Sequence, residues 1–343
     1  MAIAAGVSTA TVSRVLTPER AEQVSEKTRR KVVSAVATLG YRTNHAARSL
    51  KTRSTKTIAI VAPELANDFF MKLAEGVEQE LDQQGYTLLV ASSANSAEGE
   101  KKRIATLADR MVDGIIIIPT GSLGDQMRLL ASAGVPVVLV DRLVTGAEFD
   151  AVLSDNETGA YELTKALISD GYHSIAFVGG DLALSSAQER LTGYNRAMTE
   201  ADLKPEPKLV CLGGMGVADG YIHMEALMKY RKLPKAMVAV NLLVHLGMER
   251  YLLEYRRKAR VAGNDGESGS MVIAGFDEAD FSPFLPACRY TAAQDGASIG
   301  KHAAKLILER IAHKKKTESP VPGKRIIRLP VRIIRHYQEE ENS

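Results

Sequence analysis

A glycine turn near the start of the chain is followed by small polar residues and one arginine. The segment runs from Gly6 to Leu16 and places Thr9, Ala10 and Arg14 on one helical face. An arginine fork can donate two parallel hydrogen bonds to guanine in the major groove, and alanine can contact the thymine methyl group. An ordinary surface turn with Arg14 in solvent is the alternative. The pattern predicts the second helix of a helix-turn-helix, with DNA contacts from Ser8, Thr9, Ala10, Thr11, Ser13 and Arg14.

A second basic segment, Tyr41 to Lys56, precedes the first strand-like run of the chain. Its residues 46–50 can form only one or two helical turns, which do not persist alone in water. Leu50 stands among cations, and a leucine so placed can wedge between base pairs in the minor groove while cations such as Arg48 contact phosphates. A basic linker with Leu50 resting on the body is the alternative. The pattern predicts a segment that folds when it meets DNA.

Positive charge is concentrated in these two segments. Residues 1–56 hold 11 Lys or Arg and 3 acids, whereas the whole chain of 343 residues has a formal net charge of only +3. The remainder of the chain is therefore acidic. This imbalance indicates a nucleic-acid-binding head and a body with a different role.

The head is predicted to be entirely helical, because its apolar residues recur at helical spacing. Ser8 is expected to cap a helix whose Val12, Val15 and Leu16 face inward. A third helix is expected to begin at Ser25 and to end at Gly40. Its expected apolar stripe consists of Val32, Val33, Val36 and Leu39.

The body alternates short apolar runs with amphipathic stretches, which predicts parallel sheets with helical crossovers. Eight runs are too many for one small sheet, so we expect an α/β body of two doubly wound lobes with ligand space between them. The strand around Val152 and the segment Arg289 to Gln294 are the expected crossings between lobes. The eight runs are 58–62, 87–91, 114–118, 135–140, 174–178, 209–212, 236–240 and 271–276.

The chain contains 45% hydrophobic residues, enough for one or two sizeable cores and a small appendage. It has neither a run of eighteen apolar residues nor a signal-peptide pattern, so we expect a cytoplasmic protein without a membrane partner. Cys211 and Cys288 match no metal or redox spacing and are expected to be reduced, buried thiols.

The head, from Ala5 to Leu16, is similar to that of the lac repressor family of bacterial transcription regulators, and Asn44 to Leu50 resembles the hinge helix of that family. Further matches follow in the same order along the body at 63–70, 112–115, 136–142, 155–156, 190–194, 275–277 and 294–300. The resemblance implies hinge contacts to DNA from Asn44, Arg48 and Leu50. It also implies a homodimer, possibly a tetramer, that binds a pseudo-palindromic DNA operator.

The resemblance further implies a body like periplasmic sugar-binding proteins, with a small-molecule effector between its lobes, most simply a sugar or sugar derivative. Sugars, sugar phosphates and purines are all compatible with aromatic, arginine and carboxylate groups around one cleft. We expect a head at residues 1–43, a hinge and linker at 44–56, and a body at 57–343. The first lobe is expected at 57–153 and 290–320, and the second at 154–289 and 321–338.

Several body residues suit an effector site between the lobes. Asp141 and Asp277 each end a strand run, where open parallel sheets place ligand groups, although either could instead cap a helix. Arg190 offers a fork for hydroxyl pairs or a carboxylate, with a structural ion pair as its alternative. Asn241 can donate and accept at once, and Ser186 adds a hydroxyl.

Phe69 and Phe70 complete this predicted effector site. An aromatic face can stack on a sugar or base ring, and packing in the core is the alternative, about equally good for Phe70.

Three features depart from the family pattern. The first helix of the family starts before the position of Met1, so we expect a head that is clipped at its N-terminus. Leu242 stands where the family has an acid, which removes one polar group from the effector site. Residues 263–270 are rich in glycine where the family has a short turn.

No catalytic signature, metal-ligand spacing or dinucleotide fingerprint is present, so we expect no catalytic residue, metal or cofactor. The favoured interpretation is a sequence-specific transcriptional regulator, most simply a repressor, controlled by its effector. A cytoplasmic solute-binding module without DNA-binding activity is the alternative.

Overall fold

The computed structural model describes residues 1–16, 22–40, 54–121, 130, 134–144, 146, 148–230, 233–261, 271–315 and 323–336. The chain divides into two compact units, a head at Met1–Thr55 and a body at Lys56–Ser343. Each is described by itself.

Three helices form the described part of the head: α1 (Ala2–Ala5), α2 (Thr9–Val15) and α4 (Glu26–Leu39). Gly6 ends α1 with φ of 64°, a left-handed conformation that glycine adopts without strain. The Ser8 hydroxyl accepts a hydrogen bond from the backbone N–H of Thr11 at 3.1 Å. The prediction that Ser8 caps the second helix is therefore confirmed.

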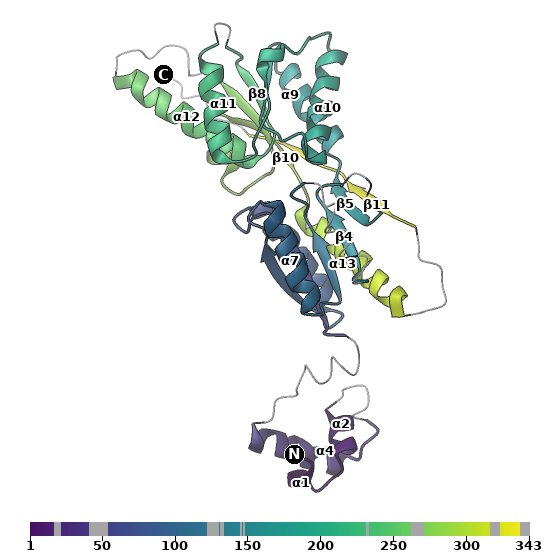
Figure 1. Cartoon of the computed structure of the whole chain (residues 1–343). Helices are drawn as coiled ribbons and strands as arrows, with labels where there is room; N and C mark the ends of the chain where they lie inside the picture. Colours follow the sequence, from purple (N-terminus) through teal and green to yellow (C-terminus); the bar gives the residue numbers. More distant parts are fainter. Residues whose placement is uncertain are drawn as a thin grey trace. The chain divides into compact units, whose positions relative to one another are not determined.

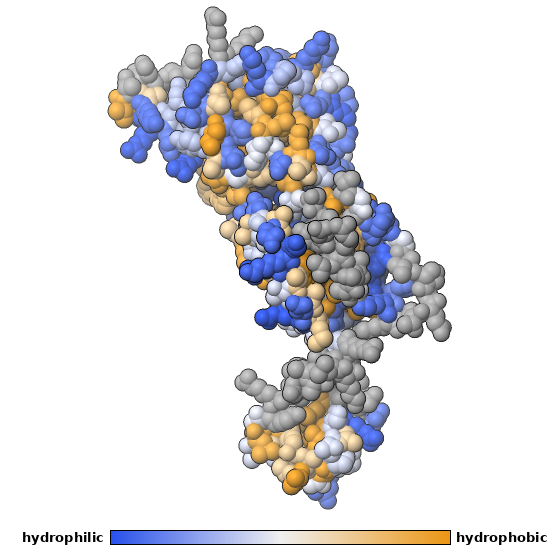
Figure 2. All heavy atoms as spheres, viewed as in Figure 1, coloured by the Kyte–Doolittle hydropathy of each residue, from blue (hydrophilic) through white to orange (hydrophobic). Residues whose placement is uncertain are grey.

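The core of the head is small and differs in part from the predicted one. Val12, Val15 and Val32 are buried together with Ala5 and Ala35. The predicted stripe is wrong at Val33 and Leu39, which are each 54% exposed. At helical spacing Ala35 lies beside Val32, and the small alanine occupies the inner face instead. On the face drawn in Figure 2, apolar residues of the head lie among hydrophilic ones.

The first lobe of the body is built on a parallel sheet of six strands in the order β11-β5-β4-β3-β1-β2 (Figure 1). Its described strands are β1 (Thr57–Ala62), β2 (Thr87–Ser92), β3 (Gly114–Ile117), β4 (Val137–Val140), β5 (Asp150–Ser154) and β11 (Ile326–Leu329).

The second lobe repeats this order with β12-β10-β9-β8-β6-β7, and only β12 runs antiparallel to its neighbour. Its described strands are β6 (Ile175–Val178), β7 (Val210–Cys211), β8 (Ala236–Ala239), β9 (Val272–Phe276), β10 (Cys288–Ala293) and β12 (Arg332–Arg335). The prediction of two doubly wound parallel lobes is confirmed, and all eight predicted runs contain a strand.

The chain crosses between the lobes after β5, after β10 and after β11. The expected lobe boundaries are wrong at two places. Tyr290 to Ala292 pair with β9 in the second sheet rather than the first, and Ile326–Leu329 pairs with β5 in the first sheet rather than the second. The third crossing lies at Pro330, whose missing N–H suits the break between two strands.

Helices cover both faces of each sheet. In the first lobe α6 (Asp68–Asp82) packs against α13 (Gly296–Lys315), and α7 (Ala97–Asp109) contacts β1 and β2. In the second lobe α9 (Asn156–Ser169) packs against α10 (Ser185–Glu200), and α11 (Val217–Met228) packs against α12 (Leu242–Val261). Figure 1 shows these two pairs on opposite sides of β8. Two short 3-10 turns, η1 (Pro207–Leu209) and η3 (Ser282–Phe284), complete the described elements.

Close helix packing explains why a glycine occurs at position 193. A Cβ atom at Gly193 would lie 2.1 Å from the carbonyl oxygen of Glu157. Glycine at this position therefore lets α10 approach α9 closely.

Both cysteines are free thiols, Cys288 buried and Cys211 half-buried. The prediction of two buried thiols is therefore wrong for Cys211, which lies in the two-residue edge strand β7. Burial raises the pKa of the Cys288 thiol to about 12. None of the described helices is both long and apolar enough to cross a membrane.

Candidate functional site

One side of α2 presents the residues that the sequence assigned to DNA. Thr9, Ala10, Ser13 and Arg14 are exposed, and Thr11 is half-buried against the head. The structure shows no ion pair between Arg14 and another described residue. Val12 and Val15 hold the opposite side of the helix in the core. The amphipathic pattern thus orients the small polar face outward.

The cap of α2 gives a direct test of how that face is held. The Ser8 hydroxyl satisfies one of the free N–H groups of the first turn and lies 2.9 Å from the Thr11 hydroxyl. We expect Ser8→Ala to lower the free energy of unfolding of the head by about 1 kcal/mol. Thermal denaturation of residues 1–56 followed by circular dichroism measures the change. Ser34→Ala, in the middle of α4, is the control and should change stability far less.

The predicted hinge contacts Asn44, Arg48 and Leu50 lie outside the described residues. Their roles remain proposals from the sequence.

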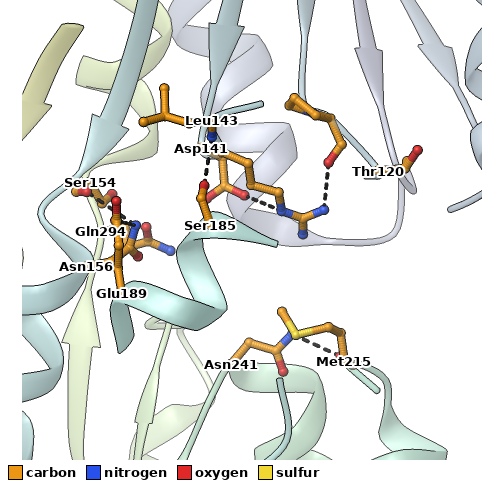
Figure 3. Close-up of polar contacts among 12 residues, drawn as sticks. Thr120, Asp141, Leu143, Ser154, Asn156, Ser185, Glu189, Met215, Asn241 and Gln294 are labelled. Atoms are coloured by element: carbon orange, nitrogen blue, oxygen red, sulfur yellow. Dashed lines mark hydrogen bonds and ion pairs between the residues drawn. The ribbon is translucent and has the colours of Figure 1, made fainter. Parts of the chain in front are cut away.

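In the body, Asp141 follows β4 and is almost fully buried. Its carboxylate pairs with the Arg142 side chain, with 3.0 Å between Oδ2 and Nε, and Arg142 donates to the carbonyl oxygen of Pro119 at 3.0 Å (Figure 3). Burial raises the pKa of Asp141, although the charges of Arg142 and Arg190 oppose this shift. Asp141 does not cap a described helix.

Asp277 occupies the matching position of the second sheet, directly after β9. The two aspartates share an unusual backbone conformation, with φ of 67° at Asp141 and 71° at Asp277. Left-handed residues other than glycine are costly and cluster at functional sites. Asp277 accepts a hydrogen bond from Gln294 Nε2, and Gln294 lies at the second crossing, just after β10. The repeated topology thus places one strained aspartate at the same edge of each sheet.

Arg190 lies in the first turns of α10 and is 3% exposed. Its Nε donates to Asn156 Oδ1 at 2.9 Å and its Nη1 donates to the carbonyl oxygen of Val240 at 2.7 Å. The guanidinium group lies 3.9 Å from the centre of the Phe276 ring. Burial lowers the pKa of Arg190, while Asp277 and Asp141 oppose that shift. Arg190, Asp141 and Asp277, from both lobes, therefore share one electrostatic environment.

Asn241 and Ser186 lie in the second lobe at the same sheet edge as Asp277. Asn241 Nδ2 donates to the carbonyl oxygen of Met215 at 2.9 Å, and its Oδ1 accepts from the N–H of Val244 at the start of α12. Ser186 is 2% exposed in the first turn of α10. Figure 3 shows Asn241 and Met215 across from Asp141 and Ser185.

Phe69 and Phe70 lie in the core of the first lobe. They are 8% and 4% exposed, and their ring centres are 5.6 Å apart. The Arg142 guanidinium lies 6.0 Å from the Phe70 ring. This placement favours the alternative that both rings pack in the core, where Phe70 lies beside Arg142.

Two hydrogen-bonded contacts join the lobes beside these residues. The N–H of Leu143 donates to the Ser185 hydroxyl at 2.7 Å. Arg328 of β11 pairs with both carboxylate oxygens of Glu189 on α10, at 2.7 and 3.1 Å. Asn156 links Glu189 to Arg190, because its Nδ2 donates to Glu189 at 3.1 Å. The candidate site is therefore connected to the lobe junction.

Besides Glu189 and Arg328, three residues of this network were not assigned a role from the sequence: Arg142, Asn156 and Gln294. Each directly follows a strand or comes within two residues of its end, so the rule that found Asp141 and Asp277 could have found them. No group of three or more His, Cys, Asp or Glu among the described residues could hold a metal ion.

The fold and the site define a helical head with a DNA-reading face, joined to a two-lobed ligand-binding body. Residues 55–334 match the periplasmic binding proteins and sugar binding domain of LacI family, and residues 1–44 match the bacterial regulatory proteins of the lacI family. The chain belongs to the LacI family of bacterial regulatory proteins.

Individual relatives are similar over nearly the whole chain. The HTH-type transcriptional repressor PurR of Vibrio campbellii is 31% identical over 311 residues, 90% of each chain. The ribose operon repressor of Haemophilus influenzae is 31% identical over 307 residues, 90% of this chain and 89% of the relative. The structure of the lac repressor dimer bound to operator and the anti-inducer ONPF has a TM-score of 0.79 at 24% identity, covering 97% and 96% of the two chains.

Proposed function

We propose that this protein is a transcriptional repressor whose affinity for a pseudo-palindromic DNA operator is set by a small sugar-like effector bound between its lobes. The observation that carries the proposal is the outward polar face of α2, with Arg14 exposed beside Thr9 and Ala10. The two relatives compared above, each matching 90% of this chain, are named as repressors. The protein acts in the cytoplasm, where bacterial DNA lies.

Control by the effector follows from the two-lobed body. Arg190, Asp277, Asn241 and Ser186 belong to the second lobe and Asp141 to the first, so a ligand that contacts both sets stabilises one angle between the lobes. That angle sets the spacing of the two hinge segments in a dimer. The effector shifts DNA affinity only by as much as its own affinity differs between the two states.

The second lobe carries an apolar surface that suits the dimer. Phe284 is 82% and Phe281 is 44% exposed. Both lie at η3, which is held by the buried Ser282, whose hydroxyl accepts from the N–H of Ala279 at 3.0 Å. Exposed aromatic residues on a fixed turn are typical of interfaces. We propose that a second copy of this chain covers them.

We expect Phe284→Asp to weaken dimerisation by about 2 kcal/mol, or about 30-fold, because an interface anchor is lost and a charge is buried. Sedimentation velocity over a dilution series measures the dimer dissociation constant. Met111→Asp, at a residue of the first lobe that is 56% exposed, is the matched control. Equal dissociation constants for both variants and the wild type would place the interface elsewhere.

DNA selection tests the proposed function as a whole. The full chain is used to enrich duplexes from a random-sequence pool, and the enriched site is measured by fluorescence anisotropy. We expect an inverted repeat, with affinity that falls steeply as salt rises, since phosphate neutralisation releases counterions. Failure to enrich any sequence would leave a solute-binding module without a DNA target.

A further inference from the structure

Helix α10 of the second lobe contacts the first lobe through two residues one helical turn apart. The Ser185 hydroxyl accepts a hydrogen bond from the backbone N–H of Leu143 at 2.7 Å (Figure 3). The Glu189 carboxylate accepts two hydrogen bonds from the guanidinium group of Arg328, at 2.7 and 3.1 Å. Residues four positions apart lie on the same face of a helix. One face of α10 is therefore bound to the first lobe at two points.

Arg328 stands where it can hold the two lobes at one angle. It lies on β11, the edge strand of the first sheet, two residues before the crossing at Pro330. The hydrogen bond to Glu189 raises the pKa of Arg328 against the opposing effect of burial, and the charges of Glu189, Asp155 and Glu157 act in the same direction as the hydrogen bond. One cation of the first lobe thus faces carboxylates from α10 and from the start of α9.

A single amide connects this ion pair to the candidate effector site. Asn156 Nδ2 donates to Glu189 Oε2 at 3.1 Å, and Asn156 Oδ1 accepts from Arg190 Nε at 2.9 Å. The amide has this orientation because a carboxylate only accepts hydrogen bonds and a guanidinium group only donates them. Arg190 and Glu189 therefore share one partner, and a displacement of Arg190 changes the hydrogen bond that Asn156 offers to Glu189.

The strength of the Glu189–Arg328 pair suits a contact that forms and breaks. A carboxylate that accepts two parallel hydrogen bonds from arginine is bound more strongly than in a single ion pair. The Arg328 and Glu189 side chains are 40% and 21% exposed, however, so water and salt still weaken their attraction. The pair can therefore favour one angle between the lobes without preventing another.

We propose that Glu189 and Arg328 form a latch between the lobes, which stabilises one lobe angle and which Asn156 couples to Arg190. This inference rests on the proposed function and names a regulatory contact within it. Glu189 is then a positioning residue, because it acts on Arg190 through Asn156. Removal of the latch increases the population of the other lobe angle.

The lobe angle of the full chain can be measured by single-molecule fluorescence energy transfer, without added small molecules. One dye is attached at Lys102→Cys on α7 and the other at Arg257→Cys on α12, both at exposed positions. The labelled chain carries Cys211→Ser. Buried Cys288 keeps its proton at neutral pH, because burial raises its pKa to about 12, and it does not take up dye. An excess of unlabelled chain ensures that each dimer carries one dye pair.

We expect Arg328→Met to shift the distribution of transfer efficiency relative to the chain without this substitution. Glu189→Gln should give a shift in the same direction, and the double variant should shift no further, because the same interaction is lost in all three. Arg332→Met, at an exposed arginine of β12, is the matched control and should cause no shift. An unshifted distribution for Arg328→Met would overturn the latch.

Salt provides a second measurement that needs no substitution in the latch. A partly exposed ion pair weakens as the ionic strength rises. Between about 0.1 and 1 M sodium chloride, the distribution of the chain with an intact latch should move toward that of Arg328→Met. The distribution of Arg328→Met itself should stay where it is. An equal response to salt in both chains would contradict the latch.

Operator affinity connects the latch to regulation. Anisotropy titrations of the enriched operator, at one fixed salt concentration, should show that Arg328→Met changes the affinity about fivefold, at the lower end of ordinary coupling between sites. Arg328→Lys keeps the charge and loses the fork, so its effect should be smaller. A merely structural role would lower the melting temperature and leave operator affinity unchanged, which would overturn the regulatory role. Failure to enrich any DNA would overturn the proposed function alone, because the lobe-angle measurement involves no DNA.

Discussion

Replacing Asp150 with asparagine is expected to lower the free energy of unfolding of the body by about 3 kcal/mol. Asp150 is 1% exposed at the start of β5. Arg310 of α13 donates to both of its oxygens at 2.7 Å, and the backbone N–H of Arg325, ahead of β11, donates to Oδ1 at 2.8 Å. Asparagine removes the negative charge that Arg310 contacts, and breaking a buried pair on one side typically costs about 3–5 kcal/mol. Urea denaturation at neutral pH measures the loss.

The same carboxylate predicts a pH dependence. Burial alone would raise the pKa of Asp150, but hydrogen bonds from Arg310 and Arg325 more than offset it and hold the pKa below the ordinary value of 3.8. A carboxylate whose pKa is lower in the folded than in the unfolded state stabilises the fold at pH values above its unfolded-state pKa. This stabilisation is lost as the pH falls through the folded-state pKa. The stability difference between wild type and Asp150→Asn should therefore be constant near neutral pH and shrink below about pH 4.

Glu309→Gln provides the matched control for Asp150. Glu309 pairs with the same Arg325, at 2.7 Å, but its side chain is 58% exposed. Exposed pairs contribute little, so the loss should stay below about 1 kcal/mol. An equal loss in the free energy of unfolding for both variants would contradict the role of the buried network around Asp150 in holding β11 beside β5.

The main strands of the body were predictable because they are buried on both sides. Runs such as Ile58 to Ala62 and Gly114 to Ile117 are continuous and apolar, and they lie in the middle of parallel sheets. The edge strands β11 and β12 were not predicted. Ile326–Leu329 and Arg332–Arg335 combine arginine with isoleucine or leucine, and each of their residues is exposed or half-buried. A short edge strand does not show which sheet it joins, because its pattern is the same in either.

The site residues that lie at strand ends could be predicted from the sequence, and their tertiary partners could not. Asp141 and Asp277 follow from the rule that ligand groups lie at strand ends, and the structure brings both near Arg190. The partners of these residues depend on tertiary contacts. Gln294 reaches Asp277 from 17 positions away and Arg328 reaches Glu189 from 139 positions away. No local pattern carries such pairings, and a single sequence read by itself cannot reveal them.

The expected effect of Arg14→Ala is a loss of about 5- to 150-fold in affinity for the enriched operator at each half-site. This corresponds to the roughly 1–3 kcal/mol of discrimination that a bidentate contact to guanine provides. Arg14 is exposed on the polar face of α2, while Val12 and Val15 on the other side keep the helix in place. Truncation therefore removes the contact without disturbing the core. Because a dimer carries two copies, the loss for a full palindrome should exceed that for one half-site.

Sequence dependence separates base reading from simple charge attraction. Anisotropy titrations with the operator and with a scrambled duplex should show a smaller ratio of the two affinities for Arg14→Ala, since a phosphate contact would weaken both duplexes alike. Arg257→Ala, which removes an exposed cation on α12 of the body, should leave both affinities unchanged. An unaltered ratio for Arg14→Ala would mean that Arg14 contacts the phosphate backbone, and base recognition would then have to come from the hydroxyl and methyl groups of Thr9, Ala10 and Ser13.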